Sequence, residues 1–251
     1  MDRLTYLGHA TVLIEVDGTR LLTDPLLRAR IGLLRARRPD IDRVVHESLD
    51  AVLLSHFHAD HLDRASLRLL DPQTLVIGPP GTATRLGRIG MRNVVELTAG
   101  ETATIGAVAI RAVHAEHGRM PGGLREVCLG FVVLGNRRVY FAGDTELYDG
   151  MAGLAADHLD VALLPVWGWG PKLGKGHLDP ERAARALSLI RPRIAVPIHW
   201  GVLHPLGVHR LDPAYLRTPG PDFARHAAVY APEVEIRLVE PSESIDLRAG
   251  S

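Results

Sequence analysis

The chain has 251 residues, 46% of them hydrophobic, and its 29 basic side chains balance 29 acidic ones. This composition can bury a sizeable core and excludes a disordered chain. A formal net charge of zero gives no electrostatic case for nucleic acid or an anionic membrane as the main partner. Cys128 is the only cysteine, so an internal disulfide and a zinc site built on several thiolates are both excluded.

The apolar runs of the sequence indicate a soluble protein. None of them approaches the roughly 20 residues that a membrane span requires, and the first residues lack the apolar core of a signal peptide. We therefore expect a cytoplasmic protein with no membrane span and no nucleic-acid partner. No Ser/Gly-rich linker divides the chain, so we expect a single domain over residues 1–251.

The first predicted elements are strands, followed by a basic segment. Residues 5–25 alternate apolar and polar positions around Asp17-Gly18, which is a strong signal for a β-hairpin. Residues 26–45 are rich in leucine and arginine with helical spacing, which favours an amphipathic surface helix. The alternative is that residues 28–47 form a lid, or a basic lip beside an active site.

The rest of the chain alternates between strand and helix patterns. We expect helices over 62–70, 81–90, 146–158 and 179–192, and strands over 50–55, 74–80, 107–115, 128–144 with a turn at Gly135-Asn136, 159–166, 193–201 and 234–247. This order predicts an α/β protein in which two sheets pack face to face with helices outside them.

The stretch "SHFHADHLD", residues 55–63, follows the predicted strand that ends the apolar run "AVLL". On extended backbone, residues two apart point the same way, so His56 and His58 can aim at one point. Asp60 and His61 can then serve a second point close by. Histidine and carboxylate are the ligands that zinc takes when cysteine is absent, so this pattern predicts two metal sites.

Further candidate ligands lie at the ends of other predicted strands. His114 closes the strand in "IRAVHAEHG", Asp144 follows the strand in "VYFAGDT", and His199 ends the strand in "IAVPIHWG". Two divalent cations can share one water molecule and hold it as hydroxide near neutral pH. We therefore expect a hydrolytic site at one edge of the sheet sandwich.

This order of residues resembles the metallo-β-lactamase fold superfamily, over almost the whole chain. The resemblance implies a four-layer αββα sandwich of two mixed sheets with helices on the outer faces. It implies that His56, His58 and His114 hold one metal, and that Asp60, His61 and His199 hold the other. Asp144 would bridge them. Asp24 in "LLTDP" would be a hydrogen-bond partner that orients the first cluster.

Shorter motifs point to one branch of that superfamily. "LGHATVLIE", "DHLD", "GHLDPERAARAL" and "IHWG" together resemble the branch of the N-acylphosphatidylethanolamine phospholipase D enzymes and the ascorbate-phosphate lactonases. That branch acts on phosphodiesters or phosphorylated lactones. Leu62-Asp63 follows the Asp-His pair where β-lactamases and thiol-ester hydrolases usually have glycine, which disfavours those two activities.

The stretch "PVWGWGPKLGKGHLDP", residues 165–180, is the most informative one outside the candidate ligands. Lys172 and Lys175 are the only lysines in the chain. One interpretation is a solvated loop held by two packed tryptophans, before a helix with Asp179 as its N-cap and Pro180 at its first position. The other is a flexible lip that binds substrate. Its substrate-binding residues would be Lys172, Lys175, Trp167 and Trp169.

Three further histidines have candidate roles. The resemblance places His177, in the H-x-D-P motif, near the active site as a hydrogen-bond or proton donor to the reacting group. His9 matches a motif of the branch, either in the pocket or packed in the core, and His117 is either an alternative to His114 or a pocket residue. The remaining histidines show no pattern and are expected on the surface; they are His46, His158, His204, His209 and His226. Residues 121–127, "PGGLREV", read as a hairpin tip.

The function that follows is a dinuclear metal-dependent hydrolase with a metal-bridging hydroxide. Asp60 would orient the hydroxide and accept its proton, and His177 would offset charge on the attacked group. We expect a small anionic substrate and favour a phosphodiester or another phosphorylated compound. The alternative functions are a lactonase, a di-iron oxidoreductase and a non-catalytic sensor. Two Zn²⁺ ions are favoured, with Mn²⁺ or Fe²⁺ also fitting these ligands. The oligomeric state stays open.

Overall fold

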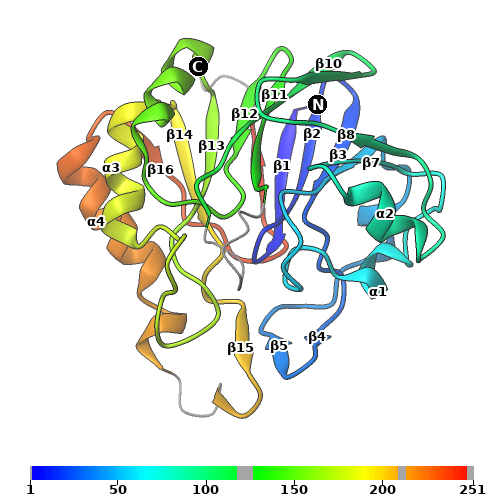
Figure 1. Ribbon diagram of the computed structural model, residues 1–251. Coiled ribbons are helices and arrows are strands. Elements are labelled where there is room, and N and C mark those ends of the chain that lie inside the picture. Colours follow the sequence, from blue (N-terminus) through cyan, green and yellow to red (C-terminus); the bar gives the residue numbers. More distant parts are fainter. Residues whose placement is uncertain (1, 118–126, 209–212, 248–251) are drawn as a thin grey trace.

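The computed structural model describes residues 2–117, 127–208 and 213–247. Two seven-stranded mixed sheets pack face to face, and helices cover their outer faces (Figure 1). This confirms the predicted α/β fold with four layers in the order αββα. In the described part of the chain, no helix is both long and apolar enough to cross a membrane.

The first sheet is antiparallel at one end and parallel at the other. Its strands, in spatial order, are β17 (Ser244–Asp246), β1 (Arg3–Gly8), β2 (Thr11–Val16), β3 (Thr19–Thr23), β6 (Ala51–Leu53), β7 (Leu75–Gly78) and β8 (Val94–Glu96). The predicted hairpin joins β2 to β3, with Val16 opposite Thr19. Asp17 and Gly18 both have positive φ, 51° and 77°, which is what a tight two-residue hairpin turn requires.

The second sheet has the same mixed character. Its strands, in spatial order, are β16 (Glu235–Ile236), β14 (Ile194–Ile198), β13 (Val161–Pro165), β12 (Arg138–Phe141), β11 (Leu129–Leu134), β10 (Val108–His114) and β9 (Thr102–Ile105). The strands from β16 to β12 are parallel, and those from β12 to β9 are antiparallel. Most of these strands were expected from their apolar patterns.

Both faces of each sheet are buried, so neighbouring residues of one strand enter different cores. Leu21 packs between the two sheets with Phe131 and Phe141. Leu22, the next residue of β3, packs with Leu67 on the helical side of the first sheet. Because side chains of a strand alternate between faces, a strand covered on both sides is a continuous apolar run rather than an alternating one.

The helices differ from the predictions in extent and in number. They are α1 (Arg64–Leu67), α2 (Thr82–Gly87), α3 (Pro180–Ile190) and α4 (Pro219–Tyr230), with 3₁₀ turns η1 (Arg43–His46), η2 (Asp149–Asp157) and η4 (Ala214–Leu216). Asp179 caps α3 by accepting a hydrogen bond from Arg182 N at 2.8 Å, and Pro180 is its first residue, as expected. The segment predicted as a helix over 146–158 is a 3₁₀ helix, and α4 was missed because its first turn reads Pro-Gly-Pro, a pattern typical of a loop.

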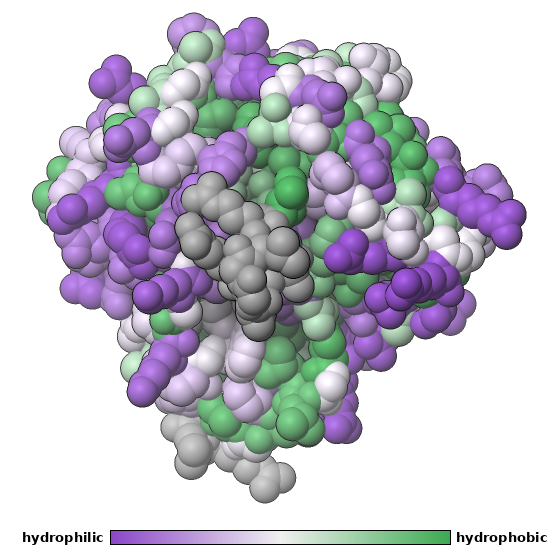
Figure 2. Space-filling model, in the orientation of Figure 1, coloured by the Kyte–Doolittle hydropathy of each residue, from purple (hydrophilic) through white to green (hydrophobic). Residues whose placement is uncertain are grey.

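The prediction of a helix over residues 26–45 was wrong. This segment forms β4 (Arg30–Ile31) and β5 (Leu34–Ala36), and β5 pairs with β15 (Leu203–Pro205) in a small third sheet. Ala36 lies opposite Leu203, so a pairing with distant chain overrides the local helical spacing. Apolar surface gathers at the lower end of Figure 2, where Figure 1 shows this sheet. Leu33, between β4 and β5, is 76% exposed. A lid role for residues 28–47 stays a prediction, and residues 121–126 of the expected hairpin tip lie outside the described residues.

The start of α4 makes a testable packing contact. A Cβ atom on Gly220 would lie 2.2 Å from Cζ2 of Trp200, whose indole is held by a 3.1 Å hydrogen bond to Pro197 O. We expect Gly220→Ala to lower the free energy of unfolding by about 1 to 2 kcal/mol, because overpacking outweighs the helix propensity of alanine. Gly153→Ala is the control, since nothing lies within 4 Å of its added Cβ. Urea unfolding of both variants measures the difference, and equal stabilities would contradict the packing.

Candidate metal centre

The histidine-rich stretch after β6 is folded into a turn. His61 N and Leu62 N both donate to His58 O, at 3.0 and 2.8 Å, so the chain reverses within five residues. Asp63 then caps α1 by accepting a hydrogen bond from Ser66 N at 3.0 Å. The helix thus begins later than we expected, at Arg64, and the turn before it places Asp60 and His61 beside the carboxyl end of β6.

Two groups of four side chains converge at this end of the sandwich. The first donor group is His56, His58, His117 and Asp144, and the second donor group is His9, Asp60, His61 and His199. Within each group, one nitrogen or oxygen atom of every residue lies within 4.8 Å of the others. Both groups can therefore surround a metal ion.

Asp144 lies between the two donor groups. Its Oδ2 is 3.3 Å from His61 Nε2 and its Oδ1 is 3.3 Å from His199 Nε2, both in the second group. The same Oδ2 is 3.9 Å from His56 Nε2 in the first group. The carboxylate is buried, and it follows Gly143, whose φ of 61° turns the chain directly after β12. A carboxylate in this position can serve both groups.

Four imidazole rings are held through one nitrogen, which leaves the other for the site. His61 Nδ1 bonds Asp24 Oδ2 at 2.7 Å, and His56 Nδ1 lies 2.9 Å from Ser55 Oγ. The other two rings bond backbone carbonyl oxygens through Nδ1, namely His199 with Trp167 and His117 with Gly176, at 3.0 and 2.7 Å. Such partners fix the tautomer and the ring orientation of a metal ligand.

Asp24 supports this arrangement from behind. It is fully buried and accepts hydrogen bonds from Ser55 N at 2.7 Å and Ser55 Oγ at 2.5 Å, besides its contact with His61. Its φ of 31° is a left-handed conformation that side chains other than glycine rarely adopt. The structure therefore places Asp24 where it orients both His61 and the start of the histidine-rich turn.

The charges of the site are strongly coupled. Burial alone would raise the pKa of Asp144, but His199 and His61 next to it hold that pKa well below its usual value. Burial opposes the charged form of His61, yet Asp144, Asp60 and Asp24 around it raise its pKa well above the ordinary value. Two buried carboxylates, Asp24 and Asp144, and the partly buried Asp60 thus demand positive charge among them, and a divalent cation can supply it.

A second observation also supports the fit of the donor set to metal ions. Among the described side chains, buried His56 Nε2 and Asp144 Oδ1 meet no hydrogen-bond partner. In addition, His61 Nε2 and His199 Nε2 lie 3.0 Å apart, and His117 Nε2 lies 3.2 Å from His58 Nδ1. Lone pairs that face one another across a few ångströms need either protons or a cation between them, and imidazole with carboxylate suits zinc, iron and manganese.

The structure places His114 outside both donor groups, so its assignment as a ligand is corrected. Strand β10 ends at His114, and its half-exposed ring bonds Glu116 Oε2 at 3.0 Å and packs edge-on against Tyr148. The chain must continue three residues beyond the strand before a side chain reaches the site. His117, which we had weighed as the alternative, occupies that place.

His9 belongs to the second donor group, beside Asp60. Its Nε2 lies 3.0 Å from Asp60 Oδ2, and its ring lies 3.9 Å from that of His199. Burial, and then repulsion from His199, lowers the pKa of His9 to about 3, so the ring is neutral at pH 7. A neutral ring whose Nε2–H faces a carboxylate donates a hydrogen bond. His9 therefore holds Asp60 in place, which the sequence left undecided.

The loop between β13 and α3 brings only one predicted side chain to the metal centre. His177 Nε2 is 3.2 Å from Asp144 Oδ2. Trp167 contributes its carbonyl to His199, while its indole nitrogen donates to Gly170 O at 2.9 Å. Trp169 is 43% exposed. Lys172 and Lys175 are both exposed, so their role toward a substrate stays a prediction.

The sequence analysis missed two residues that shape the site, and it also placed His204, outside the site, wrongly. Ser55 and Glu146 lie beside candidate ligands in the chain, but a serine and a glutamate carry no spacing signal of their own. His204, expected on the surface, is buried with its Nδ1 2.9 Å from Pro205 O, because β15 packs into the third sheet. His46, His158 and His226 are partly or fully exposed, and His209 lies outside the described residues.

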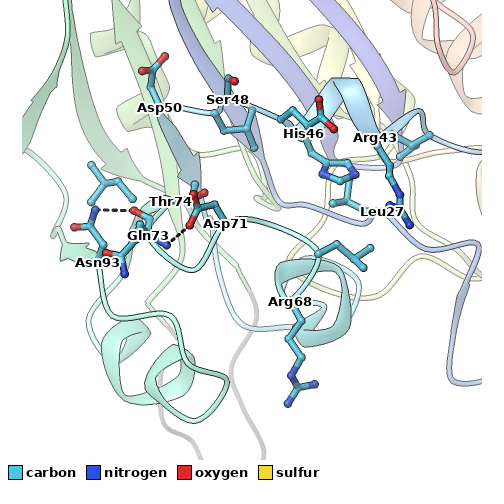
Figure 3. Close-up of a pocket in the computed structure, with 15 residues that line it drawn as sticks. Leu27, Arg43, His46, Ser48, Asp50, Arg68, Asp71, Gln73, Thr74 and Asn93 are labelled. Carbon is cyan, nitrogen blue, oxygen red and sulfur yellow. Dashed lines mark hydrogen bonds between the residues drawn. The ribbon is translucent and has the colours of Figure 1, made fainter.

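A cavity of about 830 Å³ lies away from this centre (Figure 3). Asp50, Thr74 and Asn93 line it, and they precede β6, β7 and β8. It therefore opens at the amino ends of the parallel strands, whereas His56 follows the carboxyl end of β6. None of the predicted site residues lines it.

The exchange of His114 for His117 can be tested by metal content. We expect His117→Ala to lose at least about half of the zinc retained after reconstitution, because the first donor group loses one of four ligands. His114→Ala is the matched control, and we expect it to keep the wild-type content. Elemental analysis of dialysed protein measures both. Loss of metal in the His114 variant alone would restore the original assignment.

Comparison with known proteins places the chain in a family. The "Beta-lactamase superfamily domain" family matches residues 19–200. The chain is 33% identical to a UPF0173 metal-dependent hydrolase of Deinococcus radiodurans, covering 98% of this chain and 100% of that protein. It is 31% identical to N-acyl-phosphatidylethanolamine-hydrolyzing phospholipase D 1 of Caenorhabditis elegans, covering 81% of this chain and 64% of that one.

Other relatives and a solved structure complete the comparison. The chain spans 61% of the length of an uncharacterized protein of Mycobacterium tuberculosis, to which it is 30% identical over 81% of its own length. The fold is similar to that of Igni18, described as a metallo hydrolase from Ignicoccus hospitalis, with a TM-score of 0.73, 23% identity and 97% of both chains covered. The match over residues 19–200 spans the strands and turns that carry most of both donor groups. The chain therefore belongs to the β-lactamase superfamily of metallo-β-lactamase-fold proteins.

Proposed function

We propose that this protein is a metal-dependent hydrolase that acts on a small phosphodiester or phosphorylated substrate. The observation that carries the proposal is the pair of donor groups that meet at Asp144. His56, His58, His117 and Asp144 would hold one cation, and Asp60, His61, His199 and Asp144 the other. Divalent cations bound there would lower the pKa of a water molecule and polarise the group under attack.

The protein's own residues supply orientation and charge. His9 donates to Asp60 Oδ2, so this carboxylate keeps one defined oxygen toward the site. Although burial would raise the pKa of Asp60, the imidazoles of His61, His199 and His9 hold it well below its usual value. Asp60 is therefore ionised at neutral pH and acts as an orienting acceptor more readily than as a strong base.

We infer that His177 is the hydrogen-bond donor to the reacting group. Its Nδ1 faces the carbonyl oxygen of Lys175 at 3.1 Å, and its Nε2 faces Asp144 Oδ2. Burial opposes charge on this ring, but the hydrogen bond to Asp144 raises its pKa above the ordinary value. An imidazole with protons on both nitrogens can offer Nε2–H to an oxygen that gains negative charge, which stabilises the transition state.

The positive charge of two lysines in the loop before α3 favours a phosphate-containing substrate. Lys172 and Lys175 extend from the same loop as His177, and both are exposed. The relatives named as metal-dependent hydrolases and as a phospholipase D support hydrolysis and a phosphodiester bond respectively. A lactone would use the same residues, so substrate trials must separate the two.

Turnover of model substrates tests the reaction class. We expect zinc- or manganese-loaded protein to hydrolyse bis(p-nitrophenyl) phosphate, and a chelator to abolish this activity because the attacking water is no longer activated. The control is the chelated protein after metal is restored. Hydrolysis of a simple lactone without any phosphodiester turnover would contradict the proposed substrate and support the lactonase.

The role of His177 is tested separately. We expect His177→Gln to lower kcat for the phosphodiester by about 100-fold while the metal content stays at the wild-type value, since a positioned donor typically contributes 10² to 10⁴ in rate. Steady-state kinetics and elemental analysis of the same preparation measure both quantities. His226→Gln, a change on α4, is the matched control. An unchanged kcat would remove His177 from the mechanism.

A further inference from the structure

The loop from residue 166 to residue 179 contacts the metal centre at Gly176, in addition to the contact between the Trp167 carbonyl oxygen and His199. Gly176 is buried and has a φ of 85°, which glycine adopts without strain. The side chains next to it are those of Lys175, which is exposed, and of His177, which faces Asp144. The position of Gly176 therefore decides where both of these side chains lie.

Both backbone polar groups of Gly176 are bound by side chains. Its N–H donates to Glu146 Oε1 at 2.8 Å, and its carbonyl oxygen accepts from His117 Nδ1 at 2.7 Å. A backbone N–H bound to a carboxylate is a charge-assisted hydrogen bond, which is stronger than a neutral one. Glu146 and His117 thus grip the same residue from its two sides.

These two side chains come from segments that are themselves joined. Glu146 N donates to Glu116 O at 2.6 Å, and Glu116 N donates to Thr145 Oγ1 at 2.9 Å. Glu146 follows the candidate ligand Asp144 by two residues, and His117 follows Glu116. The grip on Gly176 is therefore built on the chain segments that carry half of the first donor group.

Metal binding and this grip are coupled through the His117 ring. A neutral imidazole carries one proton, on either Nδ1 or Nε2. A cation on Nε2 obliges the proton to sit on Nδ1, which is the form that donates to Gly176 O. With the proton on Nε2 instead, two lone pairs would face each other across 2.7 Å. Occupancy of the first donor group therefore selects the ring state that holds the loop.

We propose that Glu146 is a positioning residue, and that Glu146 and His117 clamp Gly176 so that a bound metal fixes the loop that carries Lys172, Lys175 and His177. The proposal rests on the proposed function only in naming what the loop is positioned for. Glu146 acts through Gly176 and is not a member of either donor group. Arg182 adds to the clamp, since its Nη2 donates to His177 O at 2.9 Å and its Nη1 lies 3.9 Å from Glu146 Oε1.

The two lysines of the loop allow a direct measurement. They are the only lysines in the chain, so endoproteinase Lys-C can cut the protein only at Lys172 and Lys175. The rate at which the folded protein is nicked reports how often the loop opens, because cleavage of a transiently open segment tracks its open population. We expect Glu146→Ala to be nicked about tenfold faster than wild type, since a hydrogen bond to a charged group is lost.

Two variants control this measurement. Glu146→Gln keeps an oxygen that can accept from Gly176 N, so we expect nicking close to the wild-type rate. Glu101→Ala removes an exposed carboxylate that likewise accepts a backbone N–H, from Thr98 at 2.6 Å, and we expect no change. Equal rates for wild type and Glu146→Ala would overturn the clamp. If Glu146→Ala does not fold, the clamp is tested by Glu146→Gln and by the zinc experiment below. Nicking of the Gln variant as slowly as wild type then supports the clamp.

Zinc tests the coupling without any activity assay. We expect zinc to slow the nicking of wild type several-fold and to have no such effect on His58→Ala, which loses a donor but leaves the contacts of Gly176 in place. Nicking that ignores zinc, in protein shown by elemental analysis to hold it, would overturn the coupling. Failure to hydrolyse any phosphodiester would instead contradict the proposed function, and it would not affect the conclusion from the nicking rates.

Discussion

Two buried carboxylates, Asp24 and Asp144, and the partly buried Asp60 lie within reach of one imidazole, that of His61. Moving a charge out of water costs several kcal/mol unless opposite charge and hydrogen bonds meet it. The rest of the site follows from this constraint. Imidazole rings surround the carboxylates, Ser55 satisfies Asp24 from two sides, and the remaining lone pairs converge where a cation belongs.

The two-sheet architecture makes this concentration of charge stable. Strand ends from both sheets meet at one end of the sandwich, so residues from distant segments share the site while apolar side chains fill the space behind them. Several of the residues involved have strained backbone. His9, Asp24 and His199 all have positive φ, at 58°, 31° and 63°. His199 N also donates to His9 O at 2.8 Å, which ties two of these turns together. Such strain persists only where surrounding structure holds it, and it is concentrated at functional sites.

The support for the donor groups extends outward in layers. Four of the imidazoles that face the site have a partner behind them, a backbone carbonyl for His199 and His117 and a side chain for His61 and His56. This is why the loop before α3 is part of the site although only His177 reaches it. Trp167 holds His199 and Gly176 holds His117, both through backbone oxygen. Changes in this loop therefore act on the ligands without touching a metal.

The sequence by itself determined the local features of this protein. The turn at Asp17-Gly18, the cap at Asp179 and the cluster from His56 to His61 each depend on residues within a few positions of one another, so the pattern suffices to predict them. Continuous apolar runs likewise indicated strands covered on both faces. The family resemblance added the fold and the supporting place of Asp24.

Only the tertiary structure decided between candidates that local pattern treats alike. His114 and His117 differ by three residues, and the point at which β10 ends puts one in solvent and the other in the site. Residues 26–45 have helical spacing but form strands, because β15 offers β5 a partner nearly 170 positions away in the chain. The place of His9 beside Asp60 and the grip on Gly176 also join distant segments. Contacts of this kind depend on which distant segments meet in space, and spacing along the sequence does not predict those meetings.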